Sequence, residues 1–232
     1  GTGWYKHATQ FKIRGISIPR PTFPTLLSGI ATSVILTTAT LAYTFEAVSI
    51  VFVMLLMRGG VLVLAPIIDL LTGRKTRWFS WVGLLFSLAA LIVAFAGKYN
   101  PGVGLGLSAI VIIDIVAYLF AYFVRLRFMS LRAKSDDPNV TKQYFVEEQI
   151  VIVPFTIFML AGVAISHYIF GLGKFGAAVF AGFTSHWSSG MVLPTIAVGT
   201  FSQLVGIFGT LIFLDKSENT FSVPVNRSTS IL

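Results

Sequence analysis

The sequence contains no cysteine and few charged residues, and each shortage excludes whole classes of protein. Without cysteine, disulfide-linked secreted folds, thiolate metal sites and cysteine nucleophiles are excluded. Charged residues make up 11% of the 232 residues, whereas soluble domains carry about 25%. Hydrophobic residues reach 55%, and the mean hydropathy is +0.84. This composition indicates an integral membrane protein surrounded by a lipid bilayer.

Long apolar runs recur along the chain, and a transmembrane helix needs about 20 such residues. Runs such as LLFSLAALIVAFAG lack the alternation of apolar and polar residues typical of membrane β-barrels. We therefore expect an all-α, multi-span helical bundle with about 6–7 spans in one transmembrane domain, residues 1–232. Residues 171–189 should form a loop or an interfacial helix. The expected spans are 25–44, 47–71, 78–97, 103–124, 144–170, 191–214 and a partial span, 221–232, whose abrupt end suggests a piece of a longer protein.

The basic residues are distributed unevenly between the loops. If the N-terminal segment and every second loop share one side of the membrane, that side holds thirteen of the 17 Lys and Arg residues, against Lys98 and Lys174 on the other. Cytoplasmic loops carry such an excess, so we expect a multi-pass protein of a bacterial cytoplasmic membrane, with the N-terminal side of the first span in the cytoplasm. The net charge of +8 then reflects topology and predicts no nucleic-acid partner. The thirteen residues are Lys6, Lys12, Arg14, Arg20, Arg74, Lys75, Arg77, Arg125, Arg127, Arg132, Lys134, Lys142 and Lys216.

An arginine interrupts the second expected span. Arg58 lies in the stretch MLLMRGGVLVLAPIIDLL, and an arginine at the centre of a membrane helix costs roughly 2.5–3.5 kcal/mol. Such a residue should face a cavity or a partner, where it could bind an anion. The alternative is that its aliphatic stem carries the charge to the membrane interface.

A weak internal repeat supplies a second arginine. The stretch TLAYTFEAVSIVFVMLLMRGGVL, residues 40–62, is similar to TLIFLDKSENTFSVPVNRSTSIL, residues 210–232. Their alignment pairs Arg58 with Arg227. Five expected spans separate the two copies, and an odd number inverts the second copy relative to the membrane, as in many transporters.

The second span, the basic loop TGRKTRW and the third span together resemble one part of a known family. They are similar to the fourth helix, short basic loop and fifth helix of EamA-like proteins, in the drug/metabolite transporter superfamily. The loop departs from the family pattern, because Gly73 is followed by Arg74 instead of a glutamate, with Asp69 four residues before the glycine. The resemblance implies inverted five-helix repeats, ten helices in all, with the spans at 25–214 as helices three to eight. Members of this family include metabolite exporters and nucleotide-sugar transporters.

Several residues could shape such a pathway. Gly59 and Gly60 remove side chains beside Arg58, so that substrate or a neighbouring helix can approach closely. Prolines in the expected spans free backbone carbonyls and can act as hinges, although proline is common in membrane helices. These hinge candidates are Pro66, Pro154 and Pro194.

Polar residues within the spans are candidates for substrate binding. Hydroxyl residues at 33, 37, 40 and 44 share one helical face, where they could line a polar pathway or pack against a neighbouring helix. Asp114 could carry a coupling proton or pair with an arginine such as Arg58. Glu147 and Glu148 should open the fifth span and favour its N-terminus. The substrate-binding candidates are Arg58, Arg227, Asp114, Thr37, Thr40 and Gln203.

These features favour a secondary transporter over an enzyme. The sequence shows no nucleophile with a partner base, no metal-ligand set and no phosphate-binding loop, so we expect neither catalysis nor a metal or cofactor. The first hypothesis is a transporter that moves a small, anionic metabolite by alternating access. The second is a non-catalytic accessory or structural subunit of a larger membrane complex, with other membrane subunits as partners.

Overall fold

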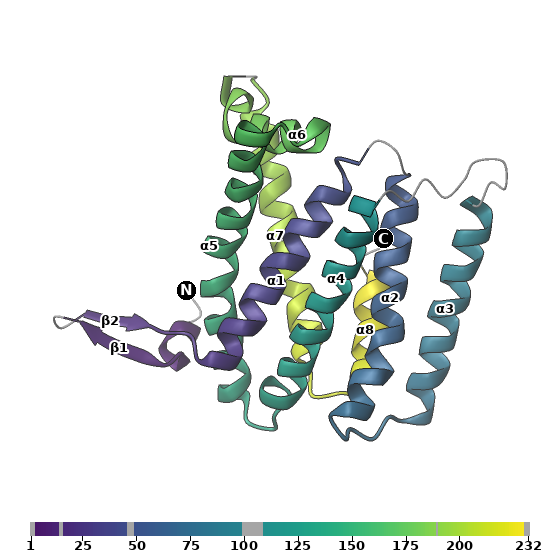
Figure 1. The fold of residues 1–232 in the computed structure, drawn as a ribbon. Coiled ribbons are helices and arrows are strands. Elements are labelled where there is room, and N and C mark those ends of the chain that lie inside the picture. Colours follow the sequence, from purple (N-terminus) through teal and green to yellow (C-terminus); the bar gives the residue numbers. More distant parts are fainter. Residues whose placement is uncertain (1–2, 14–15, 46–48, 99–108, 189, 230–232) are drawn as a thin grey trace.

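A small β-hairpin precedes a bundle of helices (Figure 1). Residues 3–13, 16–45, 49–98, 109–188 and 190–229 are described by the structure, which is a computed structural model. A 3-10 turn, Trp4–His7, leads into strands β1 (Gln10–Ile13) and β2 (Ile16–Pro19), which pair antiparallel. This hairpin was not predicted from the sequence, because two strands of four residues give too short a pattern to recognise.

After the hairpin, the described residues form eight α-helices with short connections, which confirms the all-α prediction for the bundle. Their order along the chain gives α1 to α8, with α6 lying across the end of the longer helices in Figure 1. The helices are α1 (Phe23–Ala42), α2 (Ile50–Leu71), α3 (Trp78–Lys98), α4 (Ala109–Phe128), α5 (Pro138–Phe170), α6 (Gly173–Phe183), α7 (Val192–Leu214) and α8 (Asn219–Thr229).

The start of α5 differs from the predicted span. The helix begins at Pro138 rather than at residue 144, because the Asp137 side chain accepts a hydrogen bond from the Asn139 N–H at 2.8 Å and caps the helix. Glu147 and Glu148 therefore lie well inside α5 and are fully buried. The prediction that they open this helix was wrong.

The two neighbouring segments also differ from the prediction. α4 continues to Phe128 and passes into a π-helical turn, Met129–Ala133, beyond the expected end at residue 124. Residues 103–108 of the predicted span lie outside the described residues. Within 171–189, expected to be a loop or interfacial helix, the chain forms α6 and a 3-10 turn, Ser185–Ser188.

The helices suit a lipid environment. Five of them, α1, α2, α4 with its π-helical turn, α5 and α7, are long and apolar enough to cross a membrane, and α3 has a shorter apolar stretch, Trp78–Val93. Large apolar side chains such as Phe86, Phe158 and Phe201 are exposed on α3, α5 and α7. So much exposed apolar surface fits a membrane protein.

The core lies between α1, α2, α4 and α8. The residues of α2 that point into it, Val53, Met57, Val61 and Ile68, are fully buried. α1 packs closely on α5 at Gly29, where an added Cβ would lie 2.5 Å from the Cβ of Val151.

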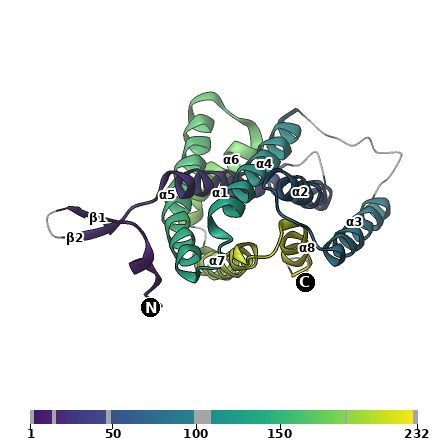
Figure 2. The same cartoon turned by 90° about the horizontal axis from the view of Figure 1, so that it is seen from below.

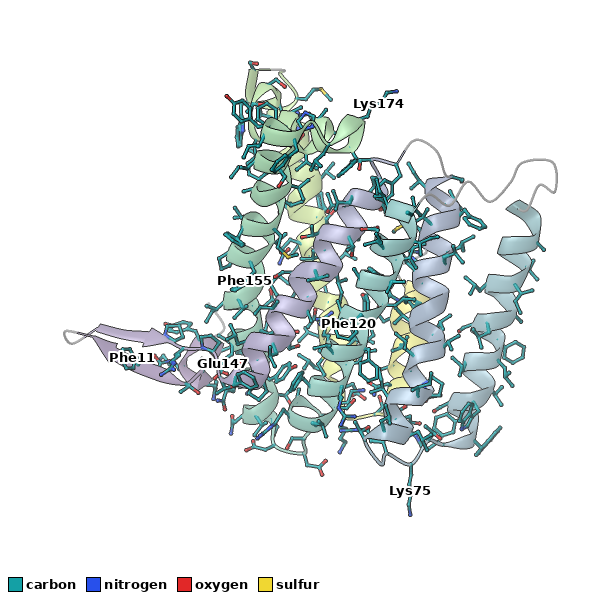
Figure 3. The ribbon with its side chains drawn as sticks, viewed as in Figure 1. Phe11, Lys75, Phe120, Glu147, Phe155 and Lys174 are labelled. Carbon is teal, nitrogen blue, oxygen red and sulfur yellow. The ribbon has the colours of Figure 1, made fainter. Side chains whose placement is uncertain are left out.

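The loops predicted for opposite sides of the membrane lie at opposite ends of the bundle. Figure 3 places Lys75, in the α2–α3 loop, at one end and Lys174, at the start of α6, at the other. We call the end formed by residues 72–77, 129–137 and 215–218 the basic end. The start of α1 also lies towards this end (Figure 1).

Candidate functional site

The α2–α3 loop is shaped by Gly73, which has a φ of 67°. The Arg74 N–H donates to the Asp69 carbonyl at 2.9 Å, and the Gly73 N–H donates to the Leu70 carbonyl at 3.2 Å. These two bonds form a Schellman cap, whose left-handed residue is usually glycine. The cap fixes Asp69 in the last turns of α2 and places Arg74 just beyond the helix.

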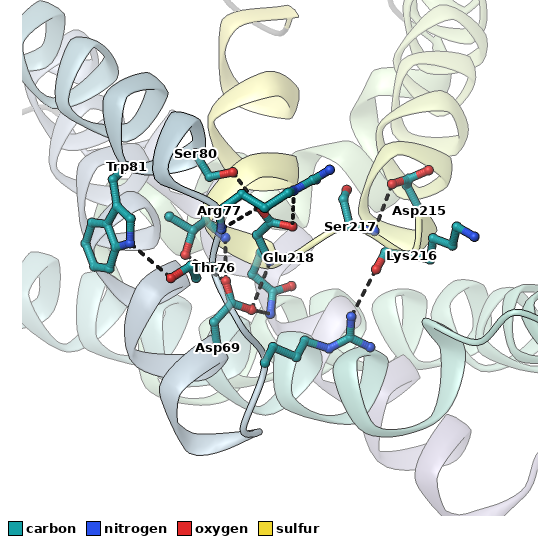
Figure 4. A network of polar contacts seen from close by, with 12 residues as sticks. Asp69, Thr76, Arg77, Ser80, Trp81, Asp215, Lys216, Ser217 and Glu218 are labelled. Carbon is teal, nitrogen blue, oxygen red and sulfur yellow. Dashed lines mark hydrogen bonds and ion pairs between the residues drawn. The ribbon is translucent and has the colours of Figure 1, made fainter.

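Asp69 is fully buried and binds the N-terminus of α8 (Figure 4). One carboxylate oxygen accepts hydrogen bonds from the Asn219 N–H and side-chain amide, at 2.9 and 2.7 Å. The other accepts from the Thr220 N–H and hydroxyl, both at 2.7 Å. N–H groups in a first helical turn lack partners within the helix, and the helix dipole favours negative charge there. Asp69 thus joins the end of α2 to the start of α8, and the two helices run antiparallel.

Glu218, the residue before α8, connects α8 to the start of α3. Its carboxylate accepts hydrogen bonds from the Arg77 guanidinium at 2.9 Å and from the Ser80 hydroxyl at 2.5 Å. Burial acts to raise the pKa of Glu218, but these hydrogen bonds outweigh it and hold the pKa at about 2. Glu218 therefore stays ionised throughout the physiological range.

Arg74, from the α2–α3 loop, and Lys134, beyond the end of α4, extend the same network. The Arg74 guanidinium donates to the carbonyls of Ser130, Lys134 and Lys216, at 2.9, 3.0 and 3.0 Å. The Lys134 ammonium donates to the Ser217 carbonyl at 2.6 Å, and burial, with the charge of Arg74, lowers its pKa to about 8. We call Asp69, Arg74, Arg77, Ser80, Lys134 and Glu218 the basic-end clamp.

A buried ion pair lies deeper in the bundle. Arg125 of α4 is 4% exposed and Glu148 of α5 is fully buried, with Nε and Oε1 3.0 Å apart. The hydroxyls of Ser28 and Thr32 on α1 also donate to Glu148, at 2.7 and 3.0 Å, and Arg125 donates to the Thr210 hydroxyl of α7 at 3.1 Å. Buried charges are tolerated only when they are paired and hydrogen-bonded. This pair therefore ties α1, α4, α5 and α7 together.

The Arg125 side chain borders a cavity of about 190 Å³ between α1, α4, α5, α7 and α8, which we call the central cavity. Two arginines, three side-chain amides and a tyrosine are among its walls, and no acidic residue is among the described residues that line it. Its polar lining residues are Thr32, Tyr122, Arg125, Gln149, Gln203, Thr210, Asn226 and Arg227.

Arg227 brings a second guanidinium to this cavity from α8. Its side chain is 9% exposed, and its guanidinium carbon lies 4.8 Å from the centre of the Tyr122 ring. Tyr122 packs in turn against Tyr118, with ring centres 4.8 Å apart. Arginine over a desolvated aromatic face is a favourable arrangement. The structure thus brings Arg227 and Gln203, two predicted site residues, to one cavity.

Arg58 lines a different cavity. This second cavity, of about 480 Å³, lies between α2 and α3 beside the end of α1, and Tyr43, Ser87 and Arg58 are its polar lining residues. Arg58 is half-buried in α2. The structure therefore does not bring Arg58 and Arg227 to one cavity.

Asp114 is buried in α4, away from both cavities. It is 6% exposed, and its Oδ2 atom has no hydrogen-bond partner in the described part of the chain. Asp114 takes part in none of the ion pairs between described residues. The predicted pairing of Asp114 with Arg58 is therefore not seen.

The predicted hydroxyl stripe of α1 packs against other groups. Ser33 donates to the Ile152 carbonyl of α5 at 3.0 Å, and Thr37 lies 4.0 Å from the Met159 sulfur. Thr40 is exposed and donates to its own helix, at the Leu36 carbonyl. Packing therefore describes Ser33 and Thr37, whereas Thr40 bonds its own backbone, and neither Thr37 nor Thr40 lines the central cavity.

The two glycines beside Arg58 allow close helix packing. An added Cβ at Gly59 would collide with the Leu91 side chain of α3, and one at Gly60 would lie 2.5 Å from Leu119 of α4. Of the predicted hinges, Pro66 and Pro154 lie inside α2 and α5, whereas Pro194 lies in the first turn of α7. A proline in a first turn breaks no hydrogen bond of the helix.

Sequence reasoning missed the residues that hold this site together. Arg125 was counted among loop charges, and Glu148 was expected at a helix end. The available signal was the spacing of Thr25, Ser28 and Thr32, which places three hydroxyls on one face of α1. In the structure, these hydroxyls donate to Glu147 and Glu148.

Comparisons with protein-family models, curated proteins and solved structures found no match for this chain.

Proposed function

We propose that the protein is a secondary transporter for a small, anionic metabolite, which binds in the central cavity. The observation that carries this proposal is a polar cavity with two guanidinium groups inside a bundle of apolar helices. Ionisable groups within a membrane are costly and commonly mark a substrate or ion pathway. The resemblance to EamA-like transporters, taken from the α2–α3 region, agrees with this class.

The lining of the central cavity supports an anion with hydrogen-bonding groups. Arg227 offers a charge and several N–H donors, while Gln149, Gln203 and Asn226 carry amides that can both donate and accept. A volume of about 190 Å³ is smaller than the roughly 300–1,000 Å³ of typical pockets for drug-sized ligands. A small carboxylate or phosphate ester fits this volume better than a nucleotide sugar.

The position of the two arginines supports a shared route. Arg58 lies eleven residues before Asp69 on α2, and Arg227 lies eight residues after the start of α8, which Asp69 binds. At a rise of 1.5 Å per residue, Arg58 lies about 16 Å and Arg227 about 12 Å from the level of Asp69. The helices that carry them, α2 and α8, are antiparallel neighbours. We propose that Arg58 receives the anion during alternating access.

The basic-end clamp supports closure of one end in this state. It joins the start of α8 to α2 and α3, and the α7–α8 loop to the end of α4. In our proposal, the clamp opens when the cavity becomes accessible from the basic end.

The test measures anion-induced stabilisation of the purified protein in detergent. Pyruvate, succinate, glutamate and inorganic phosphate are compared with glycerol and glucose, neutral compounds of similar size. At least one anion should raise the melting temperature of the wild type, and Arg227→Gln should abolish that rise. The exposed-end variant Lys174→Gln is the matched control and should keep it. An equal rise in Arg227→Gln, or no rise with any anion, would contradict the site.

The exposed surface of α7 supports a second candidate function, that of an accessory subunit of a larger membrane complex. Most side chains from residue 193 to residue 208 of this helix are exposed, and only Thr210, Phe213 and Leu214 are buried near its end. A bare helix suits a neighbouring subunit as well as lipid. Native mass measurement in mild detergent distinguishes the candidates, because a lone chain that responds to anions favours the transporter.

A further inference from the structure

The N-terminal hairpin has two different faces. β1 and β2 pair so that Phe11 lies opposite Ile18 and Ile13 lies opposite Ile16. Positions alternate between the faces of a strand, so these four apolar positions share one face of the ribbon. The other face carries Gln10, Lys12, Ser17 and Pro19.

The described part of the bundle does not cover this hairpin. Figures 1 and 2 show it extending sideways from the base of α1 and α5, away from the other helices. Phe11 is 50% exposed, and Figure 3 shows it out on the hairpin. An isolated two-stranded hairpin is only marginally stable in water. Its apolar face is therefore expected to be buried against another apolar surface.

Glu147 fixes the depth of the hairpin along the bundle. Its carboxylate accepts hydrogen bonds from the N–H and hydroxyl groups of both Thr9 and Thr22, the residues that flank the hairpin, at 2.8–3.0 Å. Glu147 lies nine residues into α5, about 13 Å from the start of that helix. The base of the hairpin is therefore held beside the helices and not beyond their ends.

The length of α5 places this depth at the membrane interface. The apolar run from Ile150 to Phe170 contains 21 residues, which span about 31 Å, close to the roughly 30 Å of a hydrocarbon core. Glu147 lies one turn before this run. A hairpin fixed there and directed sideways lies among the lipid headgroups, where water can still bond its open strand edges.

The charge of the segment matches an anionic lipid surface. The first 20 residues contain Lys6, Lys12, Arg14 and Arg20, and the first 45 contain no acidic residue. The Arg20 guanidinium carbon lies 6.0 Å from the centre of the Phe11 ring, so a cation stands beside the apolar face. Basic and aromatic residues together are typical of segments that bind anionic leaflets.

We propose that this hairpin is a membrane-interface anchor, whose apolar face enters the boundary between headgroups and acyl chains and whose basic residues bind anionic headgroups. The proposal depends on the bundle spanning a membrane and not on transport. It assigns a lipid partner to a segment outside the helices.

The chain has no cysteine, so a single introduced thiol can be labelled cleanly. Ile18→Cys places an environment-sensitive fluorophore on the apolar face, and Ser17→Cys places it on the opposite face as the matched control. Each full-length variant is reconstituted into vesicles of phosphatidylcholine alone and of phosphatidylcholine mixed with phosphatidylglycerol.

The label at residue 18 should be quenched several-fold more by brominated lipid than the label at residue 17, and less by iodide. This difference should increase when phosphatidylglycerol is present, and Lys12→Gln should reduce that increase. Equal quenching of the two labels would overturn the proposal. Disulfide-linked dimers of Ile18→Cys in vesicles would also overturn it, because a second copy would then cover the face.

Discussion

The basic-end clamp and the central cavity both contain buried charged side chains, but the two regions differ in how many of their polar groups are hydrogen-bonded within the protein. In the clamp, Asp69 accepts four hydrogen bonds from the start of α8, and Glu218 is bonded by Arg77 and Ser80. In the cavity, the side chains of Gln149 and Gln203 make no hydrogen bond to any other described residue. A region whose polar groups bind one another stabilises the fold, whereas uncommitted donors and acceptors are available to a ligand.

The largest effect is expected from the ion pair that borders the cavity. Arg125→Met leaves the Glu148 carboxylate buried without its cation, and loss of one partner of a buried pair costs about 3–5 kcal/mol. Thermal unfolding in detergent should show a large fall in melting temperature for Arg125→Met and for Glu148→Gln. The double variant should be less destabilised than Arg125→Met. A double variant destabilised by the sum of both changes would mean that the pair is not coupled.

A smaller but clear loss is expected at the clamp. Asp69→Asn removes the negative charge at the start of α8 and weakens its hydrogen bonds, and bonds to a charged group contribute about 1.5–3 kcal/mol. The free energy of unfolding should fall by this order. Asp136→Asn is the control, because its ion pair with Lys216 is highly exposed and should contribute little. Equal effects would remove the special role of Asp69.

The clamp should also respond to acid through Glu218. The pKa of this carboxyl is lowered from 4.5 to about 2 in the folded protein, so its stabilising contribution is complete above about pH 4.5 and is lost as the pH falls towards 2. The stability difference between the wild type and Glu218→Gln should therefore shrink over this interval. A difference that stays constant with pH would show that ionisation of Glu218 does not stabilise the clamp.

The smallest change in stability is expected for an uncommitted cavity residue. Gln203 is exposed to the cavity and its surroundings, so Gln203→Leu should change the free energy of unfolding by no more than about 0.5 kcal/mol. The same variant should weaken the anion-induced rise in melting temperature. If Gln203→Leu strongly destabilised the protein, Gln203 would have a structural role, like the residues of the basic-end clamp.

The sequence predicted the helices far better than it predicted their polar contacts. Apolar runs of about 20 residues identify α1, α2 and α7 because length and hydropathy are local properties of the chain. The bond between Glu148 and Ser28 joins residues 120 positions apart, and no local pattern indicates such a pairing. Gln203 was found because a polar residue in an apolar run is itself unusual, and Arg227 was found because the internal repeat pairs it with Arg58. Arg125 was missed because it stands near a basic loop.

The hairpin was missed for a different reason. Its four-residue strands are shorter than the windows over which periodicity can be judged, and its position depends on Glu147, far along the chain. Asp69 was noticed beside Gly73, but its partner, the start of α8, could not be inferred from spacing.

The bond between Asp69 and α8 also gives this pair of helices a pivot. α2 and α8 are fastened at one end, and Arg227 and Arg58 stand about 12 and about 16 Å away from that point. A tilt of about 10° between the two axes would move each guanidinium by about 2–3 Å, the scale of helix shifts in switching proteins. A small change in angle at the pivot would therefore shift both guanidinium groups by a distance comparable with the length of a hydrogen bond.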